Sequence, residues 1–136
     1  RTFDGYVYTH AVLAAFDKSG NLLWDNSFEI NDVQTFDLER YVYVSVEDDK
    51  LILFYVFDNQ IRYKTIKNSE VIEGEKYTMI SLNYINDELI DQSINEIKPW
   101  HDNYFYIYGV QQIRNLKDDD VELTRKVFYI NKIASE

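Results

Sequence analysis

The chain has no cysteine, a single proline and four glycines among its 136 residues. Without cysteine it can form no disulfide, no Cys-ligated zinc or iron–sulfur centre and no thiol nucleophile. No stretch approaches the roughly 20 apolar residues that cross a bilayer as a helix, and none resembles a signal peptide. The sequence therefore predicts a core held by packing alone and no membrane insertion.

Positive charge is scarce, because 14 Lys and Arg stand against 24 Asp and Glu and the formal net charge is −10. A chain with this charge repels phosphate backbones and anionic lipid headgroups. We therefore expect neither nucleic acid nor a membrane surface as a partner, and we attribute the acidity to solubility.

Aromatic residues are abundant at 16%, with 12 Tyr and 8 Phe, and apolar residues make up 46% of the chain. This content is too high for disorder and favours strands, whose half-buried surfaces suit aromatic side chains. We expect one all-β domain over residues 1–136. Because the first residue is Arg1 rather than Met, we expect this domain to be the C-terminal fragment of a larger protein, secreted or on the cell surface, with any export signal outside the fragment.

Alternation of apolar and polar residues predicts strands grouped into antiparallel meanders. In the first strand Tyr6, Tyr8 and His10 share one face, and Asp17–Asn21 forms a turn in which Gly20 is free to adopt a positive φ. The expected strands are 6–16, 22–30, 41–46, 51–57, 60–66, 77–84, 88–94, 104–113 and 121–133, with turns at Glu47-Asp48-Asp49-Lys50, Asp58-Asn59, Asn86-Asp87 and Asp118-Asp119-Asp120. The best helical candidate, 31–40, is too short to be decisive.

Residues 13–24 (LAAFDKSGNLLW) resemble the blade motif of quinoprotein-like β-propellers, in which a strand turns through Asp and Gly into a strand that carries Trp. The resemblance implies that Gly20 and Trp24 dock neighbouring blades together, and residues 41–66 follow the same three-strand frame. Later parts of the chain lack this Gly and Trp, no quinone-binding residue can be carried over, and no cofactor is implied.

The chain is too short for a closed propeller, which needs about four to eight blades of four strands. We therefore predict propeller-like blades that form an incomplete propeller. The alternatives are an open stack of meanders, a β-sandwich or a barrel.

Signatures of catalysis are missing, since there is no G-x-S-x-G, no H-E-x-x-H and no Gly-rich phosphate loop. Only His10 and His101 could serve as an imidazole base, and His10 lies in the middle of a predicted strand. The acidic run 118–122 lacks the ligand spacing and the glycine of an EF-hand loop, so we interpret it as a solvated turn. We expect no enzyme and no metal site.

The candidate binding residues are Trp100, His101, Asp102 and Tyr104, which lie in the run Pro99–Tyr104 before a strand. Loops on β scaffolds often carry recognition, and Trp and Tyr offer rigid contact area. The alternative is that Trp100 plugs the end of a core, and that the alternating Tyr104, Tyr106 and Tyr108 merely mark one face of a strand.

Two classes of function remain open. The first is a non-enzymatic structural or protein-interaction module of a bacterial surface or secreted protein, which binds a protein partner or associates with itself through the sheet edges 6–16 and 126–133. The second is a glycan-binding or glycan-hydrolysing accessory domain, in which an exposed Trp100 stacks on a sugar ring. Exposure of Trp100 discriminates between the two classes, because only an exposed Trp100 can stack on a sugar ring.

Overall fold

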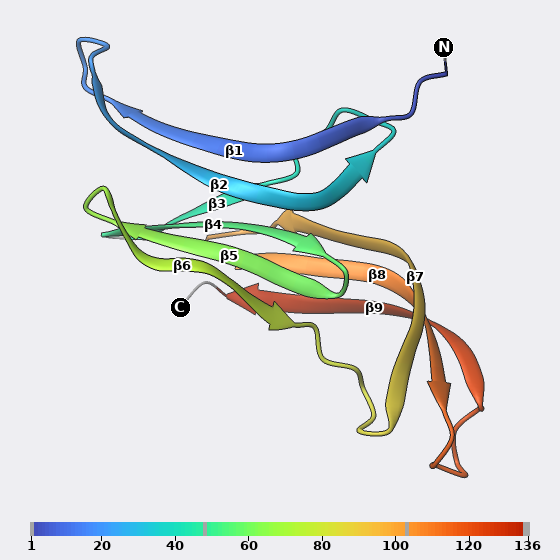
Figure 1. Ribbon diagram of the computed structural model, residues 1–136. Helices are drawn as coiled ribbons and strands as arrows, with labels where there is room; N and C mark the ends of the chain where they lie inside the picture. The colour runs from blue at the N-terminus through green and yellow to red at the C-terminus, as the bar shows by residue number, and fades with distance from the viewer. Residues whose placement is uncertain (1, 48, 103, 135–136) are drawn as a thin grey trace. The chain divides into compact units, whose positions relative to one another are not determined.

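The computed structural model describes residues 2–47, 49–102 and 104–134, with the side chains at positions 32 and 94 excepted. Within these ranges the chain forms nine strands and no helix, arranged in three separate antiparallel sheets (Figure 1). The prediction of an all-β fold is confirmed. No helix long and apolar enough to cross a membrane occurs in the described part of the chain.

The first sheet is a two-stranded hairpin of β1 (Tyr6–Phe16) and β2 (Leu22–Thr35). Its turn forms as expected, because the Asp17 carboxylate accepts hydrogen bonds from the backbone N–H groups of Ser19 and Asn21, at 2.8 and 2.9 Å. Gly20 has a φ of 86°, a conformation that glycine adopts without steric strain. The blade resemblance of this segment stays a prediction.

The alternation predicted for β1 breaks in the middle of the strand. The register shifts between Tyr8 and His10, so that Tyr8 lies opposite the buried Val33 whereas His10 lies opposite the exposed Glu29. A β-bulge of this kind moves later side chains to the other face. Tyr8 therefore does not share a face with His10, and the predicted assignment of the two to one face is wrong.

The second sheet is a meander of β3 (Tyr43–Glu47), β4 (Lys50–Phe57), β5 (Gln60–Lys67) and β6 (Glu70–Met79), in that order. Two-residue turns join the last three strands, with positive φ at Asp58 and Asn59 and again at Asn68 and Ser69. Positive φ at both central residues matches the right-handed twist of paired strands.

Three sequence predictions in this region need correction or restriction. The segment 77–84 is not a strand of its own, because only its first three residues are paired, as the end of β6. The helical candidate 31–40 continues β2 to Thr35 and then leaves regular structure. In the turn predicted at 47–50, Asp48 lies outside the described residues, while Glu47 and Lys50 pair in register.

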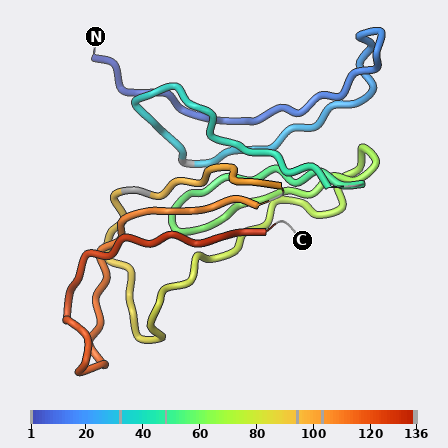
Figure 2. The backbone as a smooth tube through the Cα atoms, turned by 180° about the vertical axis from the view of Figure 1, so that it is seen from behind, coloured from blue at the N-terminus to red at the C-terminus, as the bar shows by residue number. Residues whose placement is uncertain are grey.

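The third sheet is a meander of β7 (Asp87–Pro99), β8 (Tyr104–Asn115) and β9 (Thr124–Ala134), which Figure 2 shows as three consecutive passes. The pairing of β8 with β9 is continuous from Arg114 opposite Thr124 to Tyr104 opposite Ala134. The strand predicted at 88–94 is longer than expected and reaches Pro99.

The chain divides into two compact units, Arg1–Tyr55 with Tyr63–Lys76 and Val56–Arg62 with Tyr77–Glu136. In the first unit Phe28 and Tyr55 are each 1% exposed, and their ring centres lie 5.3 Å apart. The Lys64 ammonium donates a hydrogen bond to the backbone oxygen of Ser27 at 2.6 Å, which ties β5 to β2. The β1–β2 hairpin is thus held to the second sheet through β2.

The second unit contains a buried amide cluster. The Gln111 amide donates to the Asn59 side-chain oxygen at 2.9 Å, and the Asn59 amide donates to the backbone oxygen of Ile80 at 3.1 Å. All three residues are buried. Because buried amides are satisfied only in a narrow geometry, this cluster fixes the chain after β6 to the tip of the β4–β5 hairpin and to β8.

Candidate functional site

The loop between β7 and β8 brings the four predicted binding residues together. The backbone N–H of Trp100 donates to the backbone oxygen of Tyr104 at 2.9 Å, and the backbone N–H of Tyr104 donates to the backbone oxygen of His101 at 3.0 Å. Asp102 has a φ of 52°, which a residue other than glycine rarely adopts without a local constraint. Asn103, the remaining member of the run, lies outside the described residues.

The side chains of this loop form an exposed aromatic cluster. His101 packs edge-on to both Trp100 and Tyr104, with ring centres 4.6 and 5.4 Å apart, and its Nδ1 lies 3.0 Å from an Asp102 carboxylate oxygen. Trp100 is 58% exposed, so the alternative in which it plugs a core is wrong. Its role in binding stays a prediction.

Lys132 of β9 completes the cluster and was not foreseen from the sequence. Its ammonium lies 3.5 Å from the ring centre of Tyr104 and 5.5 Å from that of Trp100. If the two strands pair symmetrically about Asp119, which lies within the predicted acidic turn, residues equally far from Asp119 face each other. Lys132 then lies opposite Tyr106, as observed. The turn centre was therefore the signal in the sequence that could have located this cation.

One face of the third sheet is lined with aromatic and apolar side chains, and we call it the tyrosine face. It carries, on β8 and β9, Tyr104, Tyr106, Tyr108, Phe128, Ile130 and Lys132. Phe128 and Ile130 are 63% and 60% exposed. The predicted placement of the three tyrosines on one face of a strand is confirmed.

A carboxylate borders this face. The Tyr108 hydroxyl donates to Glu96 at 2.7 Å, and the Lys98 ammonium lies 3.1 Å from the same carboxylate. The hydrogen bond from Tyr108 holds the pKa of Glu96 below its ordinary value, and the same bond raises the pKa of Tyr108. Glu96 is therefore an ionised acceptor at neutral pH rather than a proton donor.

The opposite end of the third sheet holds a buried polar network centred on Asp87. Arg125 donates two hydrogen bonds to the Asp87 carboxylate, at 2.7 and 2.6 Å, and Asn115 donates a third at 3.1 Å. The Arg125 guanidinium also lies over the ring of Tyr84, 5.1 Å from its centre. Burial alone raises the pKa of Asp87, but the bonds from Arg125 and Asn115 outweigh burial and hold it below its ordinary value.

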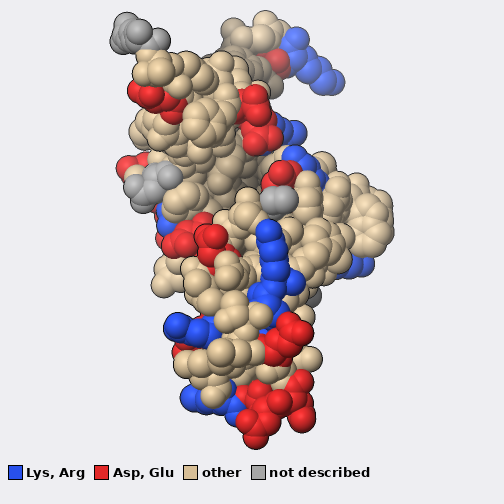
Figure 3. Space-filling model, turned by 90° about the vertical axis from the view of Figure 1, so that its right-hand side faces the viewer, with Lys and Arg blue, Asp and Glu red and all other residues tan. Residues whose placement is uncertain are grey.

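The acidic connection between β8 and β9 adjoins this network. The Asp118 carboxylate accepts hydrogen bonds from the side-chain amides of Asn86 and Asn115, at 2.9 and 2.8 Å. Acidic side chains gather at this end of the molecule, at the bottom of Figure 3. Among the described residues, which include the whole run 118–122, no group of three His, Asp or Glu is arranged to hold a metal ion.

The Asp87 network predicts a specific dependence of stability on pH. Because the folded pKa of Asp87 lies below its value of about 3.9 in the unfolded chain, its contribution is complete above about pH 5 and is lost as the pH falls through the folded pKa. The difference in unfolding free energy between the wild type and Asp87→Asn should be constant from pH 7 to about pH 5 and shrink towards pH 3. Urea unfolding at each pH measures this difference. A difference independent of pH over this range would contradict the assignment.

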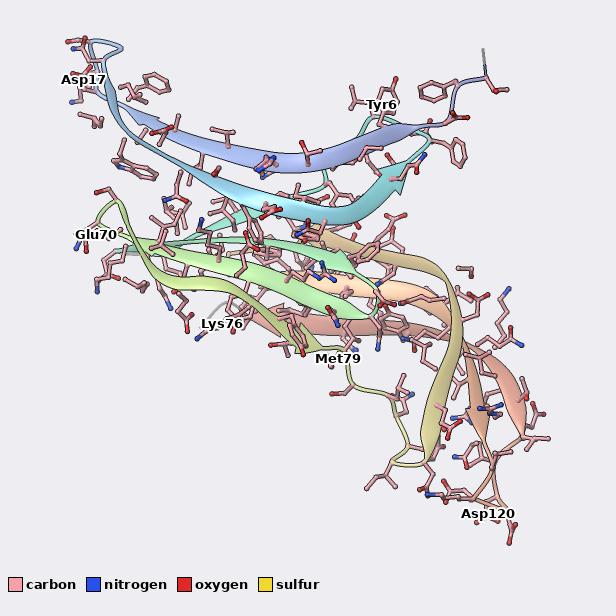
Figure 4. All side chains as sticks on the ribbon, in the orientation of Figure 1. Tyr6, Asp17, Glu70, Lys76, Met79 and Asp120 are labelled. Carbon is pink, nitrogen blue, oxygen red and sulfur yellow. The ribbon has the colours of Figure 1, made fainter. Side chains whose placement is uncertain are left out.

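A groove of about 470 Å³ lies in the second unit, beside β9. Its lining consists of Ile61, the segment 79–83 and Ile107, together with residues 131–133 of β9. Figure 4 places Met79 at the end of β6, where the chain leaves the second sheet. The volume falls in the range of sites that hold small ligands or short peptide segments.

Comparison of the chain with protein-family models, with curated proteins and with solved structures finds no match in any of the three.

Proposed function

We propose that the chain is a non-enzymatic structural or protein-interaction module, built of propeller-like blades, that associates through its open sheet edges. The observation that carries this proposal is the composition of β1, an edge strand of eleven residues without a single Lys, Arg, Asp or Glu. Proteins usually protect edge strands with charge, proline or a cover, since unpaired N–H and C=O groups template pairing with another chain. An edge without charge therefore suits a pairing surface.

Further features of β1 and β9 support the proposal. On β1, Val12 is 71% exposed and Phe16 is 60% exposed. On the other terminal strand, β9, exposed apolar side chains lie beside one free edge of the third sheet. In the described part of the chain the His101 imidazole contacts only the Asp102 carboxylate and the rings of Trp100 and Tyr104, so no hydroxyl nucleophile is paired with it.

The blade interpretation is supported by the order of the sheets. Each sheet is formed by strands that are consecutive in the sequence, and the β3–β6 meander has the four strands of one propeller blade. Successive meanders with open outer strands are what an incomplete propeller requires.

Self-association is the measurable consequence of the proposal. We expect the weight-average mass from light scattering to rise with concentration, and we expect Val12→Lys on β1 and Ile130→Lys on β9 each to reduce this rise, because a charged side chain opposes pairing at a strand edge. Ile85→Lys is the matched control, since Ile85 is 98% exposed in the connection between β6 and β7. A weight-average mass that stays at the monomer value at high concentration would contradict the proposal of self-association.

A glycan-binding module is the second candidate function, and the exposed Trp100 favours it. An aromatic ring that is open to solvent beside Tyr104 and Lys132 suits stacking on a sugar with an anionic group. In a Trp24→Phe variant Trp100 is the only tryptophan. If its fluorescence does not respond to any member of an oligosaccharide panel, this candidate is excluded.

A further inference from the structure

The groove beside β9 is bordered by residues of an edge strand. Among the described strands, β9 pairs with β8 alone, so its other edge carries unpaired N–H and C=O groups. Residues 131–133 of this strand line the groove. Such an edge is the template to which an extended peptide adds as a further strand.

Hydrogen bonds anchor another part of the lining, at Ile80. The Ile80 N–H donates to the backbone oxygen of Asn59 at 2.9 Å, and the buried Asn59 amide donates back to the Ile80 oxygen at 3.1 Å. Gln111 of β8 fixes Asn59 in turn. A groove with an anchored wall offers a preformed site, which lowers the entropy lost when a peptide binds.

The chemistry of the lining indicates which peptide would fit. The lining is mixed, and its apolar side chains that remain partly exposed are those of Ile61, Met79, Leu82 and Ile133. A bound strand directs alternate side chains towards one face, so every second residue of the peptide should be apolar.

The charge of the groove selects an acidic peptide. Lys132 is the only charged residue in the lining, and it has no carboxylate partner within the described ranges. β9 carries no acidic residue, and its exposed charges are those of Lys126 and Lys132, because the charge of Arg125 is paired with Asp87. Lys132 is therefore a cation at this edge of an acidic protein, complementary to a carboxylate.

We propose that the groove binds an extended segment of a partner protein, which adds a strand to the free edge of β9, directs alternate apolar side chains into the groove and places an acidic residue against Lys132. This inference rests on the proposed interaction function and names the class of partner. Main-chain pairing supplies affinity in such complexes, and the side-chain pattern supplies specificity.

Reversing the charge of the peptide and the charge of Lys132 tests whether the groove prefers an acidic peptide. The probes are two synthetic, end-blocked peptides, TVEVTVE and TVKVTVK, titrated by fluorescence anisotropy into dilute, monomeric protein. We expect the acidic peptide to bind more tightly to the wild type and the basic peptide to bind more tightly to Lys132→Glu, each by about fivefold, the upper range for an exposed ion pair. Lys126→Glu is the matched control, because it changes the charge of the same strand outside the groove and should leave the order unchanged.

Methylation of the peptide backbone tests strand addition. Two versions of TVEVTVE carry N-methyl groups on alternate residues, one version on the odd positions and the other on the even positions. Because only one edge of an added strand pairs with β9, one version should lose at least about tenfold in affinity, which corresponds to one or two main-chain hydrogen bonds, while the other still binds. Equal loss or equal retention would overturn strand addition.

The remaining outcomes separate this inference from the function on which it rests. If neither peptide binds, but the concentrated chain self-associates and Lys132→Glu abolishes this association, the occupant is a second copy and the peptide proposal is wrong. If neither peptide binds and the chain is a strict monomer, both the inference and the interaction function fail. If both peptides bind equally and Lys132→Glu changes neither affinity, the groove is a non-selective apolar surface and the inference is overturned.

Discussion

Replacing Asp87 by alanine is expected to lower the free energy of unfolding by about 3–5 kcal/mol, the range for breaking a buried ion pair from one side. The Asp87 side chain is fully buried and that of Arg125 is 15% exposed, so the substitution leaves a largely desolvated guanidinium without its carboxylate. Another nitrogen of this guanidinium, Nη1, already lacks a hydrogen-bond partner among the residues that the structure describes. Guanidinium chloride unfolding at pH 7 measures the loss.

Two further variants distinguish the cost of the stranded charge from a general loss of packing. Glu88→Ala removes an exposed partner of Arg114 on the same sheet and should change stability by no more than about 1 kcal/mol. The double variant Asp87→Ala, Arg125→Met removes both charges and should recover part of the loss, because no buried ion is left alone. A double variant less stable than Asp87→Ala would contradict this explanation.

Truncation of Phe28 is expected to have a comparable effect in the other unit. Phe28→Ala should lower the unfolding free energy by about 3–5 kcal/mol, because the removed ring leaves a cavity against Tyr55 that the surrounding strands fill only in part. Phe28 also lies on the strand that joins the β1–β2 hairpin to the second sheet. Its loss should therefore weaken the hold on this hairpin, which amide hydrogen exchange of β1 would reveal.

The matched control for Phe28 is Phe16, which ends β1 and is 60% exposed. Phe16→Ala removes the same ring from a solvated position and should change stability by no more than about 0.5 kcal/mol. Equal effects of the two substitutions would show that Phe28 is not part of a packed core.

The strands that were predicted well have one face buried and the other exposed. β8 alternates between buried and part-exposed positions along most of its length, and its alternation was visible in the sequence. The strand β6 was missed because nearly all of its side chains are exposed, so burial imposes no period of two on its sequence. β6 is a strand because it pairs with β5 across the turn at Asn68 and Ser69.

Part of the candidate site followed from chain order alone. Trp100, His101, Asp102 and Tyr104 are near neighbours, and a tight loop keeps neighbours together. Lys132 reaches them only through the register of β8 with β9. The ion pair of Asp87 with Arg125 joins the two outer strands of the third sheet, a contact that no local pattern specifies.

By itself, the sequence determined the all-β class, the absence of cysteine chemistry, the turn at Asp17–Asn21 and the position of the aromatic loop, because each depends on composition or on residues close together in the chain. The tertiary structure alone decided the register shift between β1 and β2, the partners of Lys132 and Arg125, the exposure of Trp100 and the groove beside β9. These features arise where strands distant in sequence are brought into register. Register and burial are set by the packing of the whole sheet, which no single segment encodes.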